Sequence, residues 1–198
     1  EAFVFHQEDR MDDGRIFSVF TKEFGRLEIF GKAIRKIDSK LCGGMNLFSF
    51  CAIEFIQGKH TKTLTDVLPI EKYRSLAQDP ERFQTANAMA RVLADFIRGQ
   101  ELDGDIWNFI KDSFGKLQSP ATNHKFLYYY FFWNFISLLG YEPELSRCVM
   151  CRQPLAPGNL YFSHTNGGVA CNMCAAHDAT AKKINADVVK ILRLILKK

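Results

Sequence analysis

Long hydrophobic runs are absent from this chain of 198 residues. The longest apolar stretch covers residues 126–139 and includes Asn134 and Ser137, whereas a membrane-spanning helix needs about 20 apolar residues. The first residues are followed at once by charged side chains, so nothing near the N-terminus resembles a secretory signal. We therefore expect a cytoplasmic protein in which the apolar stretch forms a buried helix.

Sequence motifs of the common catalytic sites are absent as well. The chain has no nucleophile elbow, phosphate loop, dinucleotide fingerprint or metalloprotease helix. Its five histidines have no acidic or cysteine partner at catalytic spacing. Glu142 and Glu144 form a pair of carboxylates, but they flank Pro143 and are typical of a solvated turn. The sequence favours a binding protein over an enzyme, and we predict no catalytic residue.

Cysteines, in contrast, are grouped near the end of the chain. Two C-x2-C pairs are separated by 19 residues, and their members are Cys148, Cys151, Cys171 and Cys174. Four thiolates bind zinc tetrahedrally, and this spacing is typical of a four-cysteine site. Two disulfides are an alternative that needs an oxidising compartment, and His164 or His177 could replace a cysteine ligand. Because four cysteines already complete the shell, we predict one structural Zn²⁺ per chain with no open position for a substrate.

The first 78 residues alternate between apolar and polar side chains with the period of β-strands. Five strands are expected, at residues 1–7, 15–21, 26–35, 46–57 and 61–69. Gly31 marks a bend in the third strand, and Cys42 and Cys51 are expected to be small core thiols. Five short strands suit a small closed barrel of the oligonucleotide/oligosaccharide-binding (OB) type, although an SH3-like barrel would show nearly the same pattern.

The period of the sequence changes near residue 78. Asp79 and Pro80 form a helix start, the first as N-cap and the second at the first helical position. Apolar side chains at helical spacing predict helices at residues 79–98, 105–117, 119–139 and 185–198. We therefore predict an α+β chain with an OB-type domain at 1–78 and a helical domain at 79–198. A zinc ribbon at about residues 146–176 is inserted into the second domain.

Basic residues gather in two places, although the net charge is only +4. The group in the barrel is predicted to bind DNA, and it comprises Arg26, Lys32, Arg35, Lys36, Lys40, Lys59 and Lys62. On an OB barrel such cations follow phosphates while aromatic rings stack on bases, and Phe30, Phe48, Phe50 and His60 lie nearby in sequence. A solvated loop is the alternative for the cations, and the barrel interior is the alternative for the phenylalanines. The second group closes the chain from Lys182 onwards.

Three segments carry motifs that are specific as a set. Residues 13–27, DGRIFSVFTKEFGRL, form a hairpin with an acid and an arginine before its turn, and residues 31–36 read GKAIRK. Residues 138–151 read LLGYEPELSRCVMC, and residues 167–175 hold the second cysteine pair. The set resembles the bacterial recombination mediator family RecO along nearly the whole chain. In that family, glycine is commoner at the position of Ala33, and a few residues precede the strand in which this chain begins.

The resemblance implies a non-enzymatic DNA repair protein of the bacterial cytoplasm, associated with the nucleoid. Members bind single- and double-stranded DNA, anneal complementary strands and, with RecR, help load RecA onto strands coated by single-stranded DNA-binding protein; RecF takes part indirectly. The acidic tail of that coating protein ends in phenylalanine, so its receptor needs an apolar slot rimmed by cations. We predict this slot in the helical domain, with aromatic residues from 126–135 and the cations Arg147, Arg152, Lys190 and Arg193. A zinc-ribbon adaptor that recruits proteins without binding DNA is the alternative function.

Overall fold

The structure is a computed structural model of the chain. It describes residues 1–10, 13–36, 38–73, 76, 78–99, 103–156 and 158–197. Contacts divide the chain into two compact units, Glu1–Tyr128 and Tyr129–Lys198. These units are defined by packing, so they differ from the segments 1–78 and 79–198 expected from strand and helix content, and that domain boundary stays a prediction.

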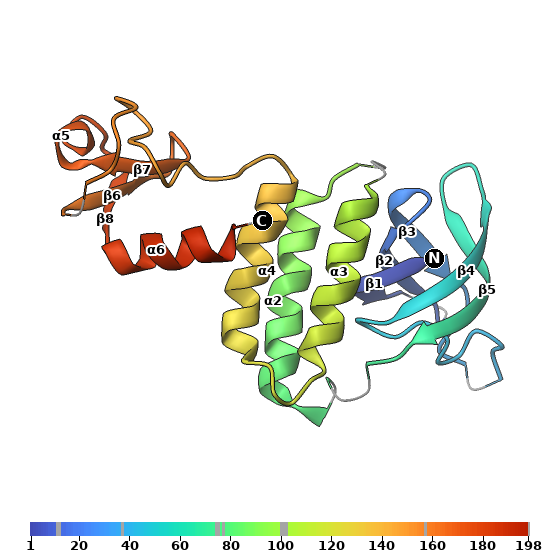
Figure 1. Cartoon of the computed structure of the whole chain (residues 1–198). Helices are drawn as coiled ribbons and strands as arrows, with labels where there is room; N and C mark the ends of the chain where they lie inside the picture. The colour runs from blue at the N-terminus through green and yellow to red at the C-terminus, as the bar shows by residue number, and fades with distance from the viewer. Residues whose placement is uncertain are drawn as a thin grey trace. The chain divides into compact units, whose positions relative to one another are not determined.

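The first unit contains five strands and two complete helices (Figure 1). Their bounds are β1 Ala2–Asp9, β2 Arg15–Thr21, β3 Gly25–Gly31, β4 Phe50–Gln57, β5 Lys62–Glu71, α2 Pro80–Phe96 and α3 Gly104–Leu117. The strands close into a barrel in the order β1-β2-β3-β5-β4. Neighbours are antiparallel except β3 and β5, which run parallel through the pairs Ile29–Lys62 and Phe30–Thr63. The predicted five-stranded barrel of OB type is confirmed.

The barrel is apolar on two faces. One set of side chains fills its interior, and includes Val4, Phe17, Val19, Leu27, Ile29, Cys51 and Leu64. A second set of phenylalanines packs on α3: Phe3 lies 4.5 Å from Phe114 between ring centroids, and Phe50 lies 5.4 Å from Trp107. Burial on both faces removes more apolar surface from water than a one-sided barrel would, which accounts for the high phenylalanine content.

Two strand boundaries differ from the sequence expectation by four residues each, and the other boundaries differ by at most two. β3 ends at Gly31 rather than at residue 35, because the chain turns back there and buries Ile34 in the barrel to 5% exposure. A Cβ atom on Gly31 would lie 3.1 Å from the Cδ1 atom of Ile34, so a side chain there would push Ile34 by a few tenths of an ångström. β4 begins at Phe50 rather than at residue 46, after Phe48 takes a positive φ of 60°.

The two cysteines outside the C-x2-C pairs differ in burial. Cys51 is buried as expected, and its burial raises the pKa of the thiol to about 12. Cys42 is exposed, so the expectation of a core thiol at that position is wrong. Strand-like neighbours in sequence did not make a strand there, because residues 40–48 form successive turns.

Helix caps follow the sequence closely. The Asp79 side chain accepts hydrogen bonds from the N–H groups of Glu81 and Arg82 at 3.1 and 3.2 Å, as an N-cap does. The Arg82 guanidinium donates to the Leu117 and Ser119 carbonyl oxygens at 2.7 Å, which joins the start of α2 to the end of α3. The helices expected from residues 79 and 105 are thereby confirmed.

Helix α4, His124–Leu138, spans the boundary between the two units and contains most of the long apolar stretch. It begins later than expected, because residues 119–122 form turns and the Asn123 side chain accepts the N–H of Phe126 at 3.0 Å. Phe131 and Phe135 are buried, whereas Phe126 and Tyr129 are exposed, so burial is confined to part of the helix. No helix within the described residues combines the length and apolarity needed to cross a membrane.

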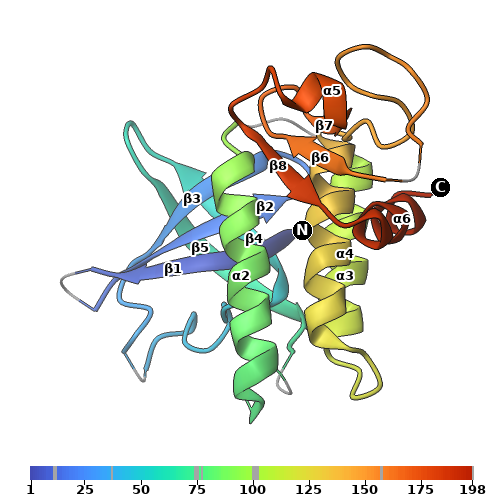
Figure 2. The same cartoon turned by 90° about the vertical axis from the view of Figure 1, so that its left-hand side faces the viewer.

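The second unit is a small sheet with two further helices (Figure 2). Its elements are β6 Leu160–Ser163, β7 Gly168–Cys171, α5 Asn172–Ala175, β8 Ala181–Ile184 and α6 Ala186–Ile195. The sheet is antiparallel with the order β7-β6-β8. Val189 and Leu192 of α6 pack with Leu145, Leu160 and Val169 in one apolar cluster. The Asn185 cap of α6 was predicted, whereas β8 was not, because its four residues are too few to show a period.

Candidate functional site

The four grouped cysteines form a compact cluster in the second unit. Cys148 and Cys151 lie in the turn before β6, Cys171 ends β7, and Cys174 lies in α5. Their sulfur atoms all lie within 4.8 Å of one another. Four thiolates at about 2.3 Å from a zinc ion are about 3.8 Å apart, so the cluster has nearly the dimensions of a tetrahedral site. These four residues could hold a metal ion.

Backbone N–H groups point at the sulfur of Cys148. The Cys171 N–H donates to it at 3.4 Å, and the N–H of Arg152 donates to the Cys148 carbonyl oxygen at 2.9 Å, which closes a tight turn. Desolvation acts to raise the pKa of Cys148, but hydrogen bonds from the N–H groups of Cys151, Cys171 and Met150 outweigh it and lower the pKa to about 6. This sulfur is therefore prepared to act as a thiolate ligand.

Cys174 has the opposite tendency. Its pKa is raised to about 12, first by a side-chain hydrogen bond with Cys171 and then by desolvation. Metal ligation requires the thiolate, so a cation that enters this cluster displaces protons. The structure pairs none of the six cysteines in a disulfide, so the four clustered sulfur atoms are arranged as separate potential ligands.

A groove of about 470 Å³ lies on the barrel beside the parallel pairing of β3 with β5. Its lining includes Ile16, Arg26, Glu28, Phe30, His60, Lys62 and Arg98. OB barrels bind oligonucleotides on the face of the second and third strands, next to the loop between the fourth and fifth. That loop is residues 58–61 in this chain. The groove therefore has the position of an OB ligand site, and it collects four residues that the sequence singled out.

Arg26 has a structural task in this groove. Its guanidinium donates to the carbonyl oxygens of Ala94 and Ile97 at 2.9 Å each, and lies 5.5 Å from the centre of the Phe5 ring. These bonds satisfy carbonyls at the end of α2 that have no partner within the helix. The side chain is 25% exposed. Its predicted DNA contact stays a prediction, but its Nη1 atom already serves the fold, and its Nη2 atom lies 3.7 Å from the Glu28 carboxylate.

The other predicted cations, apart from Arg35, fall into two groups. Lys32, Lys36 and Lys40 are exposed in the turns after β3, and Lys59 and Lys62 flank the loop between β4 and β5. Lys62 pairs with Ile29, which precedes Lys32 by three residues or about 10 Å of strand. Parallel pairing of β3 with β5 thus places Lys62 beside the end of β3, from which the loop with Lys32, Lys36 and Lys40 departs.

Arg35 differs from its lysine neighbours because it is paired with acids. Its guanidinium lies 3.3 Å from the Asp9 carboxylate and 3.7 Å from that of Asp13, and donates to the Arg10 carbonyl at 3.2 Å. It joins the loop after β3 to the connection between β1 and β2. Neutralised charges contribute little to phosphate attraction, so the exposed lysines are better placed for it.

Two of the three phenylalanines considered for stacking are buried. Phe48 and Phe50 are each 1% exposed and pack against rings of α2 and α3, so a stacking role for them is wrong. Phe30 lines the groove and is partly exposed. Arg98 also lines the groove, and the sequence did not predict it as a site residue. It follows the end of α2, and no local pattern in the sequence shows that this part of the chain lies beside β3.

Both parts of the chain match the models of one family. The model described as Recombination protein O N terminal matches residues 1–73, and the model described as Recombination protein O C terminal matches residues 77–198. The chain belongs to the RecO family. This agrees with the barrel, the helices and the clustered cysteines described above.

Several curated proteins named DNA repair protein RecO are similar to this RecO-family chain. One from Dehalococcoides mccartyi is 28% identical over 181 residues, which cover 91% of this chain and 71% of that protein. One from Prosthecochloris aestuarii is 27% identical, with coverage of 80% and 64%. One from Caldanaerobacter subterraneus is 24% identical, with coverage of 100% and 79%. The chain therefore spans between 64% and 79% of the length of these relatives.

Residues predicted for a partner site of the RecO-family chain lie in the second unit. Arg193 donates through Nε and Nη2 to the Leu145 carbonyl oxygen, and so holds α6 to the segment before Cys148. Lys190 is exposed and lies 3.0 Å from Asp187. Arg147 and Arg152 are exposed, and Arg152 has a positive φ of 63°. Arg193 is thus the member of the set with a structural task.

A hollow of about 490 Å³ is lined by Arg193 and by two carboxylates, Glu142 and Glu144, so negative charge prevails there. The N–H groups of Ser146 and Arg147 donate to the Glu144 side chain and lower its pKa, so the group is ionised at neutral pH. An acidic peptide would be repelled there. The predicted tail receptor therefore finds no support at this hollow.

Proposed function

We propose that this RecO-family chain binds single- and double-stranded DNA without sequence preference and anneals complementary strands, as a non-enzymatic repair protein. The observation that carries the proposal is the groove on the OB face, where Lys62, His60 and Arg98 surround Phe30. Such a groove combines cations for phosphates with an aromatic ring for a base. Exposed Lys32 and Lys36 lie beyond the end of β3 and extend the basic surface.

Annealing requires neutralisation of the phosphate charges rather than tight recognition of either strand. Two strands repel each other through their phosphates, and mobile lysine ammonium groups reduce that repulsion without fixing the position of either strand. Base edges must stay available for pairing, so contacts to phosphates and base faces suit the reaction better than contacts to base edges. The groove and the exposed lysines provide the first two kinds of contact.

The ion at Cys148, Cys151, Cys171 and Cys174 is proposed to be Zn²⁺, one per chain and structural. A closed four-thiolate shell leaves no position for substrate. Its role is to join the turn before β6 to β7 and α5, because the three carry its ligands. The soft sulfur donors favour zinc over magnesium or calcium.

The proposed partners are RecR, which acts with the chain to load RecA, and the acidic tail of single-stranded DNA-binding protein, with RecF taking part indirectly. The proposed location is accordingly the bacterial cytoplasm at the nucleoid. For the tail we keep the exposed cations Lys190, Arg147 and Arg152 of the second unit. Charge reversal in Lys190→Glu is expected to weaken the binding of a fluorescent tail peptide about tenfold or more, while binding of naked DNA persists. If peptide anisotropy changes only when the loop lysines are altered, the receptor lies on the barrel.

Salt dependence of DNA binding tests the main proposal. The double variant Lys32→Ala, Lys36→Ala should weaken binding of any single-stranded oligonucleotide, and should flatten the slope of log K against log salt by about 1.4. Lys125→Ala, which removes an exposed lysine of α4, is the matched control and should change neither quantity. An annealing assay on complementary oligonucleotides should slow in the double variant alone.

Two outcomes would contradict the proposal. If the wild-type chain does not bind DNA, or binds it with an affinity that does not depend on salt, the result would favour the zinc-ribbon adaptor instead. An unchanged slope in the double variant, with salt-dependent binding in the wild type, would move the DNA site away from this loop.

A further inference from the structure

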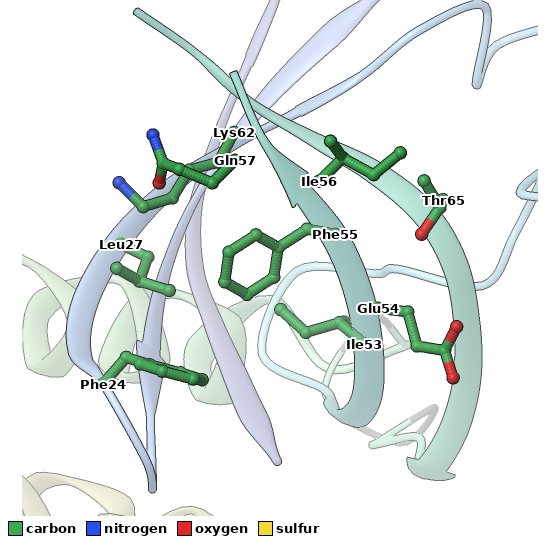
Figure 3. A pocket seen from close by; sticks show the side chains of 9 residues that line it. All are labelled: Phe24, Leu27, Ile53, Glu54, Phe55, Ile56, Gln57, Lys62 and Thr65. Atoms are coloured by element: carbon green, nitrogen blue, oxygen red, sulfur yellow. The ribbon is translucent and has the colours of Figure 1, made fainter. Parts of the chain in front are cut away.

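A second and larger hollow opens between β3 and β4, with a volume of about 730 Å³ (Figure 3). Its apolar part consists of Phe24, Leu27, Ile53 and Phe55. Figure 3 shows Phe24 and Leu27 on one side of the gap and the Phe55 ring directed towards them from the other. Leu27 and Lys62 line both this hollow and the groove on the OB face, so the two sites adjoin at these residues.

The hollow exists because the barrel closes incompletely on this side. β3 and β5 pair through only two residue pairs, so residues 25–28 of β3 have no strand beside them on that edge, where the Arg26 N–H donates to the Gly99 carbonyl oxygen at 3.3 Å. A register shift between Glu54 and Phe55 also interrupts the regular pairing of β4 with β5. Side chains that would fill the interior of a fully closed barrel therefore face an opening.

An exposed phenylalanine is held in place at this opening. Phe24 is 53% exposed at the turn between β2 and β3. Its N–H donates to the Thr21 hydroxyl at 3.0 Å, and that hydroxyl donates to the Gly25 carbonyl at 2.9 Å. Its ring lies 5.9 Å from the Phe55 ring, edge to face. The backbone of Phe24 and its ring are thus both held in place. Binding to this flat apolar surface therefore costs little further conformational entropy.

Lys62 is the cation that lines the hollow and stands at one end of it, and the other polar residues of the lining are Gln57, Glu54 and Thr65. Lys62 and Gln57 lie together there, and the Gln57 amide nitrogen donates to the Gly58 carbonyl oxygen at 2.8 Å. The carboxylate of Glu54 is directed to the opposite side of β4 in Figure 3. An occupant would therefore meet aromatic faces along its length and one cation at the end that adjoins the groove.

We propose that this hollow binds unstacked bases of a single DNA strand, which stack on Phe24 and Phe55 while Lys62 carries the adjoining phosphate. The proposal rests on the proposed function, and it adds the residues that distinguish single strands from duplex. Bases in a duplex are paired and stacked on one another, so they cannot enter. Stacking uses the faces of the bases and leaves their pairing edges open to a complementary strand, which suits annealing.

Phe24→Ala is the decisive variant, because an exposed ring can be removed without opening the core. It should weaken oligo(dT) binding about 5- to 150-fold, the range for loss of one aromatic–base stack. Binding of an abasic oligonucleotide of equal length and charge, and of duplex, should not change, nor should the salt slope for oligo(dT). Phe24→Trp should restore binding. Leu68→Ala, at a 68% exposed position of β5 outside the hollow, is the control.

Phe55→Leu supplies a second test that keeps the partly buried volume, and it should weaken oligo(dT) in the same selective way. Unchanged oligo(dT) affinity in Phe24→Ala overturns the inference, as does an equal loss for the abasic oligonucleotide. Wild-type affinity in Phe24→Leu would identify an apolar surface of the kind that takes a peptide side chain, and would also overturn it. If wild-type protein binds none of the DNAs, the proposed function itself fails.

Discussion

Ala33 adopts a backbone conformation that glycine tolerates better. Its φ of 52° lies in the left-handed region, and the RecO family commonly has glycine at this position. For a residue with a Cβ atom that conformation costs about 1–2 kcal/mol, whereas the greater freedom of glycine in the unfolded chain costs about 0.4–1 kcal/mol. Ala33→Gly should therefore raise the free energy of unfolding of the first unit by about 1 kcal/mol.

Gly43 offers the matched opposite change. Its φ is 69°, and no described atom would lie within 4 Å of a Cβ atom there, so Gly43→Ala adds backbone strain and no clash. We expect it to lower the free energy of unfolding by about 1 kcal/mol or slightly more. Both positions lie between β3 and β4, so the pair compares the same strain in the same loop with opposite sign.

The two tryptophans of the chain make the measurement specific to one unit. Trp107 is buried in α3, where it contacts Phe20 and Phe50, and so reports on the first unit. Trp133 lies in the second unit, so the measurements are made in a Trp133→Phe background. Urea unfolding followed by Trp107 fluorescence then gives the free energy for that unit. An unchanged or lowered value in Ala33→Gly, together with the expected loss in Gly43→Ala, would refute the strain argument.

Two further predictions concern the second unit. Wild-type protein should contain about one equivalent of zinc, and Cys171→Ser should lose it and destabilise the ribbon by several kcal/mol, measured by metal analysis and by Trp133 fluorescence on melting; a metal-free wild type would contradict this. Hydrogen bonds from Ser163 and Thr180 lower the pKa of Asp178 to about 2. Because this folded-state pKa lies below the unfolded value of about 3.9, the stabilisation is complete above about pH 4 and is lost as pH falls towards 2. Asp178→Asn should remove that part of the acid dependence of melting; an identical acid profile would refute it.

Features encoded within a few residues could be predicted from the sequence. The two cysteine pairs need only the C-x2-C spacing, and the caps at Asp79 and Asn185 act on N–H groups two or three residues away. The β2 strand was predicted with its observed ends because its β-branched and aromatic residues are bounded by the turn at Gly14 and the hairpin connection that ends at Gly25. In each case the residues that indicate the feature are close together in the sequence.

Features that depend on distant partners could not be predicted. Phe24 and Phe55 are remote in sequence, and only the incomplete pairing of β3 with β5 brings their rings together. Phe48 and Phe50 were considered for stacking because alternation does not show that a helix covers the outer face of a strand. Ile34 continues an apolar pattern, but it reaches the core through a reversal of the chain at Gly31 rather than through a longer strand.

Charge alone also failed to separate two kinds of basic residue. Arg26, Arg35 and Arg193 donate to backbone carbonyls that few other groups could reach, because a guanidinium presents five donors in a fixed fork. The lysines at 32 and 36 are exposed in turns, where a flexible stem lets a single charge follow a moving phosphate. Alanine substitution should therefore lower stability at the arginines, and should flatten the salt slope of DNA binding at the lysines with little change in stability. A steep loss of salt dependence in a folded Arg26→Ala variant would overturn this division.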